Sequence, residues 1–215
     1  MRNYITEFIG TFFLVLTVGF CVTSNAPLGA LAIGSSLMIM VYMGGHISGG
    51  HYNGAVSLAV FLRGKIDART FVGYLISQLL GAIAAALIVY LVTSKTYPLA
   101  PGPGVSPMAA LIVETLYTFA LCIVVLNVAT SPDTEGNSYY GLAIGFTIVV
   151  AAISGGSISG GAFNPDVGTG PILVDAILKG GSLANVWLYL VGPFLGGALA
   201  AWVYRLQNAA PAAST

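Results

Sequence analysis

Long apolar segments without charged residues dominate the pattern along this chain of 215 residues. Between Glu7 and Arg63 there are 55 residues without a single Asp, Glu, Lys or Arg. Further charge-free runs cover 70–94, 96–113, 115–132, 136–165 and 180–204. A helix needs roughly 20 apolar residues to cross the hydrocarbon core of a bilayer. The pattern therefore predicts six membrane-spanning helices, at about 4–23, 28–46, 70–92, 108–128, 139–155 and 184–206.

Two shorter apolar stretches remain, at about 53–62 and 164–178, and each follows a glycine-rich turn. They are too short to cross a bilayer and too apolar to be ordinary loops. Irregular backbone at membrane depth is tolerated only where protein buries it or where it lines water. We therefore interpret both stretches as re-entrant half-helices, which enter the membrane and stop near its middle.

The composition agrees with a polytopic helical membrane protein. Hydrophobic residues make up 57% of the chain and charged residues 7%, with a net charge of zero; soluble domains carry about 25% charged residues. This content excludes disorder, and the absence of a basic excess argues against nucleic-acid binding. Two cysteines, Cys21 and Cys122, do not make a disulfide scaffold. Long apolar runs also argue against an outer-membrane barrel, whose strands alternate.

The distribution of basic residues predicts the orientation, because cytoplasmic loops are enriched in Lys and Arg. With both termini cytoplasmic, five basic residues lie inside (Arg2, Arg63, Lys65, Arg69 and Arg205) and two outside (Lys95 and Lys179). No clear small-residue cleavage site follows the first apolar run, so we interpret it as a span and not as a signal peptide. We expect a multi-pass protein of the inner or plasma membrane.

The chain contains an internal repeat. Residues 46–53 (HISGGHYN) align with residues 157–164 (SISGGAFN) at an offset of 111, and five of the eight positions are identical. Glu7-x-x-x-Thr11-x-x-Leu14 likewise aligns with Glu114-x-x-x-Thr118-x-x-Leu121, and 80–82 loosely matches 195–197. Because each half contains three spans, the second half is inverted relative to the first. Inverted repeats with broken helices place a substrate path near the bilayer midplane.

The repeats define one domain over residues 1–207. We expect a first repeat at about 4–92, a linker at 93–107 and a second repeat at about 108–206. The linker contains four prolines, which are incompatible with a helix interior. The tail 208–215 is small and polar, and we expect it to be disordered.

The motifs at the two half-helix starts resemble those of the aquaporin and glyceroporin family (major intrinsic proteins), in a divergent form. That family carries two asparagine–proline–alanine triplets, which stand here as Asn53-Gly54-Ala55 and Asn164-Pro165-Asp166. The resemblance covers about residues 4–206. It implies the aquaporin-like fold, a passive channel for water and small neutral solutes in the lipid bilayer, a homotetramer with one pore per subunit, and no cofactor.

Asn53 and Asn164 are the expected pore asparagines. A half-helix that starts at mid-membrane exposes unpaired backbone N–H groups and the positive end of its dipole. Two such ends facing one another repel cations and protons. If both side-chain amides donate to one water oxygen, the hydrogens of that water point away along the pore and the proton-conducting chain is broken. The plainer alternative is that each asparagine is a helix N-cap, and both roles can coexist.

The loops before the asparagines also have expected roles. Gly49, Gly50, Gly160 and Gly161 allow an unusual backbone path, although ordinary turn chemistry would explain them as well. By the resemblance, carbonyls around Gly50-His51-Tyr52 and Gly161-Ala162-Phe163 form a ladder of acceptors along the pore. The resemblance also suggests that Glu7 and Glu114 support these loops by accepting their backbone N–H groups. The rival role for these two acids is proton coupling in a transporter.

The expected selectivity filter is apolar. Water channels of the family usually place an arginine directly after the second triplet, where this chain has Val167. Counting back from the asparagines gives Ile33, Ala152 and Gly161 as the other three filter positions. Such a constriction should be wider and less polar than a strict water filter. Glycerol, urea and neutral metalloid hydroxides are then expected permeants, along with ammonia or hydrogen peroxide.

Two residues depart from the family triplets. Gly54 replaces a proline that would pre-set the first helical turn, and it restores a backbone N–H. Asp166 brings a carboxylate to the start of the second half-helix, where an anion is favourable. Asp166 either caps that helix or stands at the pore wall, where it would weaken the exclusion of cations.

Three other function classes stay open at this stage. One is an aquaporin-fold channel that leaks cations. Another is an ion-coupled secondary transporter, which also uses inverted repeats but would want a coupling carboxylate. The third is a membrane scaffold without a pore. No catalytic constellation occurs, so we expect no enzyme, and His46 and His51 alone are too few for a metal site.

Overall fold

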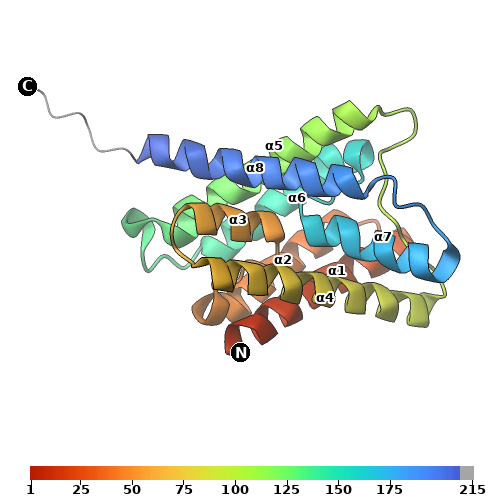
Figure 1. Ribbon diagram of the computed structural model, residues 1–215, viewed down its shortest axis with the longest axis horizontal. Helices are drawn as coiled ribbons and strands as arrows, with labels where there is room; N and C mark the ends of the chain where they lie inside the picture. Colours follow the sequence, from red (N-terminus) through yellow and green to blue (C-terminus); the bar gives the residue numbers. More distant parts are fainter. Residues whose placement is uncertain (209–215) are drawn as a thin grey trace, which may run out of the picture.

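The computed structural model describes residues 1–208; the predicted disordered tail lies, from residue 209 onward, outside this part of the chain. The elements are α1 (Arg2–Ser24), α2 (Gly29–Ser48), α3 (Gly54–Leu62), α4 (Ala68–Thr93), α5 (Pro107–Thr130), a 3₁₀ turn (Pro132–Thr134), α6 (Tyr140–Ser159), α7 (Pro165–Lys179) and α8 (Val186–Gln207). The long helices run along one common direction, as Figure 1 shows. Each predicted span and half-helix corresponds to one of these helices.

Six of the described helices are long and apolar enough to cross a membrane: α1, α2, α4, α5, α6 and α8. The remaining two are shorter, with 9 residues in α3 and 15 in α7. At 1.5 Å per residue they reach about 14 and 22 Å, which is less than the roughly 30 Å hydrocarbon core. The predicted all-helical fold with six spans and two half-helices is therefore confirmed.

The helices of the two repeats interlock. Within each repeat the first and last long helices pack together, α1 against α4 and α5 against α8, while α2 and α6 meet between the repeats. The half-helix α3 packs on α8 of the second repeat, and α7 packs on α4 of the first. In Figure 1, α3 and α7 approach the middle of the bundle from opposite ends. The centre of the bundle consequently needs both halves of the chain.

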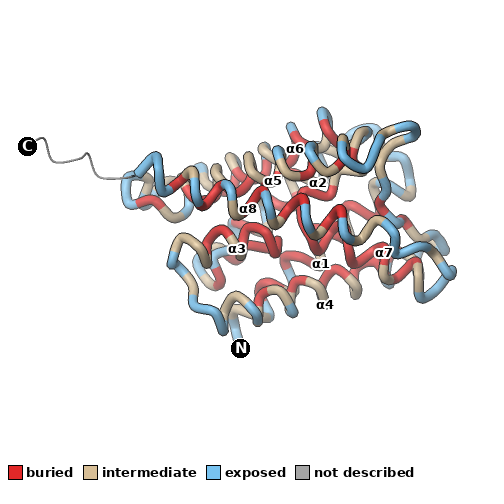
Figure 2. The backbone as a smooth tube through the Cα atoms, turned by 45° about the horizontal axis from the view of Figure 1, so that its top comes forward, coloured by how far each residue is buried: buried red, intermediate tan, exposed pale blue. Residues whose placement is uncertain are grey.

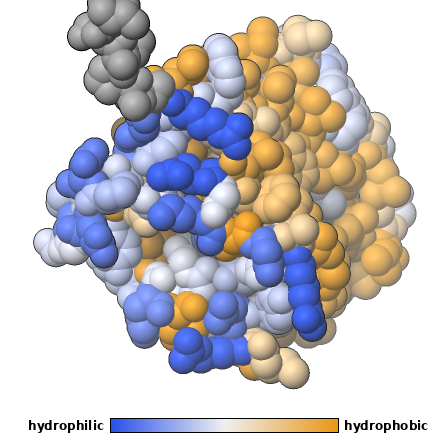
Figure 3. Space-filling model, turned by 60° about the vertical axis from the view of Figure 1, so that its left-hand side comes forward, coloured by the Kyte–Doolittle hydropathy of each residue, from blue (hydrophilic) through white to orange (hydrophobic). Residues whose placement is uncertain are grey.

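The flanks of the bundle are apolar, as expected for a surface in contact with lipid. Ile76, Leu116 and Ile153 are 57%, 59% and 70% exposed, although each lies within a spanning helix. Figure 2 shows buried residues on the sides of the helices that face the middle of the bundle, and exposed residues on their outward sides and in the connections at the two ends. In Figure 3 polar residues gather on the end that carries the C-terminus, and the neighbouring flank is hydrophobic. The chain is thus a multi-pass membrane protein.

Small residues permit close packing of the last helix of each repeat. A Cβ atom added at Gly81 would lie 2.6 Å from the carbonyl oxygen of Phe8, and one added at Gly196 would lie 2.5 Å from that of Thr115. Both distances are too short for real carbon–oxygen contacts. The helix backbones therefore approach one another closely at equivalent places in the two repeats.

Basic residues contact neighbouring helices at both ends of the bundle. The Arg63 guanidinium lies 4.8 Å from the centre of the Tyr204 ring, and Arg205 donates to the carbonyl of Leu62. At the opposite end, the Lys95 ammonium donates to the Thr23 carbonyl over 3.2 Å. The predicted separation of basic residues between two ends exists in the structure. The assignment of the first end to the cytoplasm stays a prediction.

Candidate functional site

Asn53 and Asn164 begin the two half-helices with the same backbone geometry, φ −162° and ψ 122°. The Asn53 Oδ1 atom accepts hydrogen bonds from the backbone N–H groups of Ala55 at 2.9 Å and Val56 at 3.3 Å. The Asn164 Oδ1 atom accepts from the N–H of Asp166 at 2.9 Å. Both asparagines are therefore N-caps, which satisfy donors that a helix start leaves unpaired.

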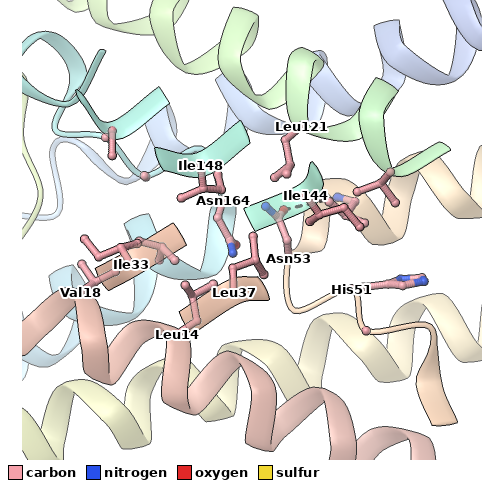
Figure 4. Close-up of a pocket in the computed structure, with 17 residues that line it drawn as sticks. Leu14, Val18, Ile33, Leu37, His51, Asn53, Leu121, Ile144, Ile148 and Asn164 are labelled. Carbon is pink, nitrogen blue, oxygen red and sulfur yellow. Dashed lines mark hydrogen bonds between the residues drawn. The ribbon is translucent and has the colours of Figure 1, made fainter. Parts of the chain in front are cut away.

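The amide nitrogens of the same two side chains reach across to the other repeat. Asn53 Nδ2 donates to the Phe163 carbonyl over 2.9 Å, and Asn164 Nδ2 donates to the Tyr52 carbonyl over 2.8 Å. In Figure 4 the two side chains lie near the centre of the cavity described below. An amide nitrogen carries two hydrogens, so each asparagine keeps a second donor after this bond. Each asparagine side chain therefore caps its helix and also offers a hydrogen-bond donor to the cavity.

The loops that lead to the asparagines have matching, unusual backbone conformations. Gly49 and Gly160 end α2 and α6 at φ 94° and 95°, in a region that glycine alone adopts freely. Tyr52 and Phe163 both have φ 49°, a left-handed conformation that costs about 1–2 kcal/mol for a residue with a side chain. Such conformations persist only where the surroundings impose them.

Glu7 imposes this path on the first loop. Its carboxylate accepts the Ser48 hydroxyl at 2.6 Å, the backbone N–H of His51 at 3.0 Å and that of Tyr52 at 2.7 Å. The side-chain amide of Gln78 adds a fourth donor at 2.8 Å. Glu7 is fully buried, so these four bonds replace its hydration. Glu7 therefore contacts the loop in the way that the resemblance suggested.

Glu114 holds the second loop in the same way, with one donor fewer. It accepts the Ser159 hydroxyl at 2.6 Å, the N–H of Ala162 at 3.0 Å and the N–H of Phe163 at 2.6 Å. Pro193 stands where the repeat would place a counterpart of Gln78. Gln78 was not among the site residues expected from the sequence, although a polar side chain inside an apolar span is a signal for such a role.

A narrow cavity of about 30 Å³ lies between α1, α2, α5 and α6, at the point where the two loops meet. Figure 4 shows the side chains around it. The lining residues are Leu14, Val18, Ile33, Leu37, Gly50, His51, Asn53, Val56, Leu121, Val125, Ile144, Ile148, Ala152, Gly161, Ala162, Asn164 and Val167. All four expected filter positions are among them. A water needs roughly 10–15 Å³ of such space, so the cavity has room for only a few water molecules.

The cavity lining follows the internal repeat. Val56 and Val167 are related by the offset of 111 residues, as are Ile33 and Ile144. The Leu14 and Leu121 positions end the two aligned motifs of the first spans, so the repeat could have identified them as lining residues. These apolar positions were not among the site residues expected from the sequence.

His51 marks the boundary between the narrow cavity and a larger one. The larger cavity has a volume of about 620 Å³, and its lining includes Lys65, Glu135 and Asn137, so it forms a polar vestibule. His51 lines both cavities, and its Nδ1 atom lies 3.1 Å from the Ser57 hydroxyl. The corresponding residue in the second repeat is Ala162, so the path is asymmetric here.

The expected carbonyl ladder divides into two groups. Gly50, His51, Gly161 and Ala162 line the narrow cavity. The carbonyls of Tyr52 and Phe163 instead accept the asparagine amides, and their side chains are buried outside the described lining. These two carbonyls therefore connect the repeats, which their place in the sequence motif did not indicate.

Asp166 lies in the first turn of α7, as expected, but its hydrogen-bond partner belongs to the other half-helix. Its Oδ2 atom accepts the backbone N–H of Gly54 at 2.9 Å, so it caps the half-helix of the other repeat instead of its own. Asp166 is 5% exposed and does not belong to the described lining of the narrow cavity. The carboxylate turns toward the start of α3, which argues against the alternative that placed Asp166 at the pore wall.

Comparisons with known proteins agree with this geometry. The family model described as Major intrinsic protein matches residues 1–204. The chain is 36% identical to "Glycerol uptake facilitator protein-like 6" of Lactiplantibacillus plantarum, with 97% of this chain and 99% of the relative covered. It is also 36% identical to "Aquaporin NIP1-1" of Zea mays, over 96% of this chain and 74% of the relative.

A solved structure has a similar fold. The X-ray structure of the aquaglyceroporin from Plasmodium falciparum matches with a TM-score of 0.84 and 25% sequence identity. The match covers 94% of each chain. The resemblance inferred from the two asparagine motifs thus extends over the whole described bundle.

Proposed function

Because the chain belongs to the major intrinsic protein family, we propose that it is a passive channel for water and small uncharged solutes. Members of this family are channels and not enzymes. The proposal places the permeation path in the narrow cavity and continues it through the vestibule beyond His51. Passage is driven by the concentration or osmotic gradient alone.

The observation that carries this proposal is the pair of asparagine amides in an apolar cavity. Among the described lining residues, polar side chains come from Asn53, Asn164 and His51. The two amides stand at the positive ends of two helices, and each has a second hydrogen to donate. A water molecule that accepts both is oriented with its own hydrogens away from the centre. Water passes in this arrangement, while proton transfer along the chain of waters is interrupted.

The proposed filter consists of Ile33, Ala152, Gly161 and Val167. It contains no charged side chain, and the place of the arginine found in many family members is taken by Val167. An apolar wall lowers the desolvation mismatch between the pore and solutes that carry carbon or a metalloid centre. We extend the permeants to glycerol, urea and neutral metalloid hydroxides. The names of a glycerol facilitator-like relative and of an aquaglyceroporin neighbour support this class of solute.

The buried acids favour a passive channel over the two rivals. Glu7 and Glu114 lie outside the described cavity lining, and each accepts several hydrogen bonds from a loop, which leaves them poorly placed to shuttle protons. Asp166 points toward Gly54. An ion-coupled transporter would use a carboxylate on the substrate path, and none of the described lining residues of the narrow cavity is an acid.

We further propose a homotetramer in the cell membrane with both termini in the cytoplasm. The cluster of Arg63, Lys65 and Arg69 at one end supports this orientation, because cytoplasmic connections carry the excess of basic residues. Each subunit would contain a complete path, since the cavity is built from one chain.

Stopped-flow light scattering of proteoliposomes tests the proposed permeants. A glycerol gradient first shrinks the vesicles as water leaves, and the vesicles reswell as glycerol enters. We expect both phases to be faster than in empty liposomes and independent of any ion gradient. Fast shrinkage without accelerated reswelling would refute the wide filter while leaving a water channel. Rates that saturate and follow an ion gradient would favour the transporter.

A further inference from the structure

The two departures from the family triplets contact one another. Gly54 is the first residue of α3, and Asp166 is the second residue of α7. The Gly54 nitrogen lies 2.9 Å from the Asp166 Oδ2 atom, and both residues are buried. The sequence separates them by 112 positions. A single hydrogen bond therefore joins the starts of the two half-helices, next to the asparagines that they carry.

The internal repeat provides a comparison within the same molecule. The residue directly after each asparagine is Gly54 in the first repeat and Pro165 in the second. The residue after that is Ala55 in the first repeat and Asp166 in the second. The two repeats are related by an approximate two-fold axis. The pair of Gly54 and Asp166 on one side therefore corresponds to the pair of Pro165 and Ala55 on the other. Both positions of this pair therefore differ between the two repeats.

Chemistry explains why the two changes belong together. Proline has no N–H, and its ring carbon Cδ occupies the place of the amide hydrogen. A proline at position 54 would direct this carbon at the Asp166 carboxyl group and leave a buried carboxyl oxygen without its donor. An alanine at position 166 would conversely leave the Gly54 N–H without its partner. A buried group without a hydrogen-bond partner costs more free energy than its bond contributes.

We propose that Gly54 and Asp166 act as one unit that fixes the starts of the half-helices and thereby positions Asn53 and Asn164 for the permeating solute. Asp166 is a positioning residue in this account, because it acts through the helix start and not by contact with the solute. At the start of α3 this pair fixes the first helical turn, as Pro165 does at the start of α7. The carboxylate also lies at the positive ends of both helices, where an anion is stabilised.

A double-mutant cycle tests the unit. Asp166→Ala removes the acceptor, Gly54→Pro removes the donor, and the double variant removes both. We expect each single variant to lower the unfolding temperature in detergent by about 5 °C or more. The double variant should recover most of the loss. Full recovery requires a small shift of Leu75, whose side-chain end would lie 3.0 Å from a Cβ at position 54.

Asp166→Asn separates the hydrogen bond from the charge. It keeps an oxygen acceptor for the Gly54 N–H and removes the ionisable group. We expect this variant to retain the osmotic permeability and the sodium exclusion of the parent. Asp166→Ala should reduce the ratio of water permeability to sodium leak severalfold, because the asparagines lose their alignment. Asp133→Asn removes an exposed acid outside the spans and serves as a matched control.

The outcomes separate the proposal from its rivals. Losses that add in the double variant would overturn it, because additivity indicates two independent sites. A wild-type unfolding temperature and permeability in Asp166→Ala would overturn it as well. If a single variant does not insert, recovery of folded protein in the double variant gives the same information. The unfolding readout does not depend on the permeant, so it remains valid if the proposed function fails.

Discussion

The side-chain nitrogen of Asn53 lies 2.9 Å from the carbonyl oxygen of Phe163, 110 positions further along the chain. The reciprocal bond from Asn164 to the Tyr52 carbonyl measures 2.8 Å. Each half of the molecule therefore holds the loop of the other half through the residue that begins its own half-helix. The central cavity exists only when both repeats are assembled.

Replacing Asn53 by Asp tests the donor. The variant keeps an oxygen for the N-cap but loses the N–H group, and it places a negative charge opposite the Phe163 carbonyl. We expect a loss of about 1–3 kcal/mol in stability and a larger sodium leak into proteoliposomes. The leak is measured with a sodium-sensitive dye.

Asn185→Asp is the control, because Asn185 begins α8 without a side-chain cap hydrogen bond. Equal leaks in the Asn53 variant and in this control would contradict the assigned role of the amide. A stable, tight Asn53 variant would contradict it in the same way.

Glu7→Gln tests the support of the first loop. Glutamine offers one oxygen and one N–H₂ group, so part of the side chain would face the donor groups of His51, Tyr52 or Gln78. We expect a loss of about 2–3 kcal/mol in stability and a lower osmotic permeability. Thermal unfolding followed by circular dichroism measures the loss.

Glu114→Gln should cost less than Glu7→Gln, because Glu114 accepts three of these bonds and Glu7 four. The exposed Asp133, outside both described cavity linings, provides a control for charge removal alone. If Asp133→Asn destabilised the protein as much as Glu7→Gln, the loop-support account would fail.

Val167→Arg tests the filter. The arginine would bring a charge and a large side chain to the cavity wall, where glycerol needs more width than water. We expect glycerol flux to fall at least about tenfold, equivalent to about 1.4 kcal/mol in the barrier, with a smaller effect on water. Val167→Leu adds volume without charge and distinguishes size from electrostatics. Equal losses of water and glycerol flux in the arginine variant would contradict the filter assignment.

The positions of the spans could be predicted from the sequence, because a helix needs roughly 20 apolar residues to cross the bilayer and the charge-free runs have this length. The run from 8 to 62 alone contains most of α1 and all of α2 and α3, and its glycine-rich turn separates the half-helix from the span before it. The repeat offset then matched the bounds of α2 to those of α6 without adjustment.

The partner of Asp166 did not follow from the sequence. A residue in the first helical turn can point toward its own helix start, toward the cavity or toward a neighbouring helix, and the motif does not distinguish these directions. The answer depends on how α3 and α7 meet, which is a property of the assembled bundle. Gln78 was missed for a related reason, since its partner Glu7 lies 71 positions away.

Blocking the narrow cavity tests the central claim most directly. Ala152→Trp would fill a space of about 30 Å³, and Leu91→Trp places the same side chain on the lipid-facing surface, where Leu91 is 72% exposed. Osmotic permeability of proteoliposomes is measured for both variants beside the parent. We predict the rate of empty liposomes for Ala152→Trp and the parent rate for Leu91→Trp, with similar unfolding temperatures. Parent-like permeability in a folded Ala152→Trp variant would show that the solute takes another path.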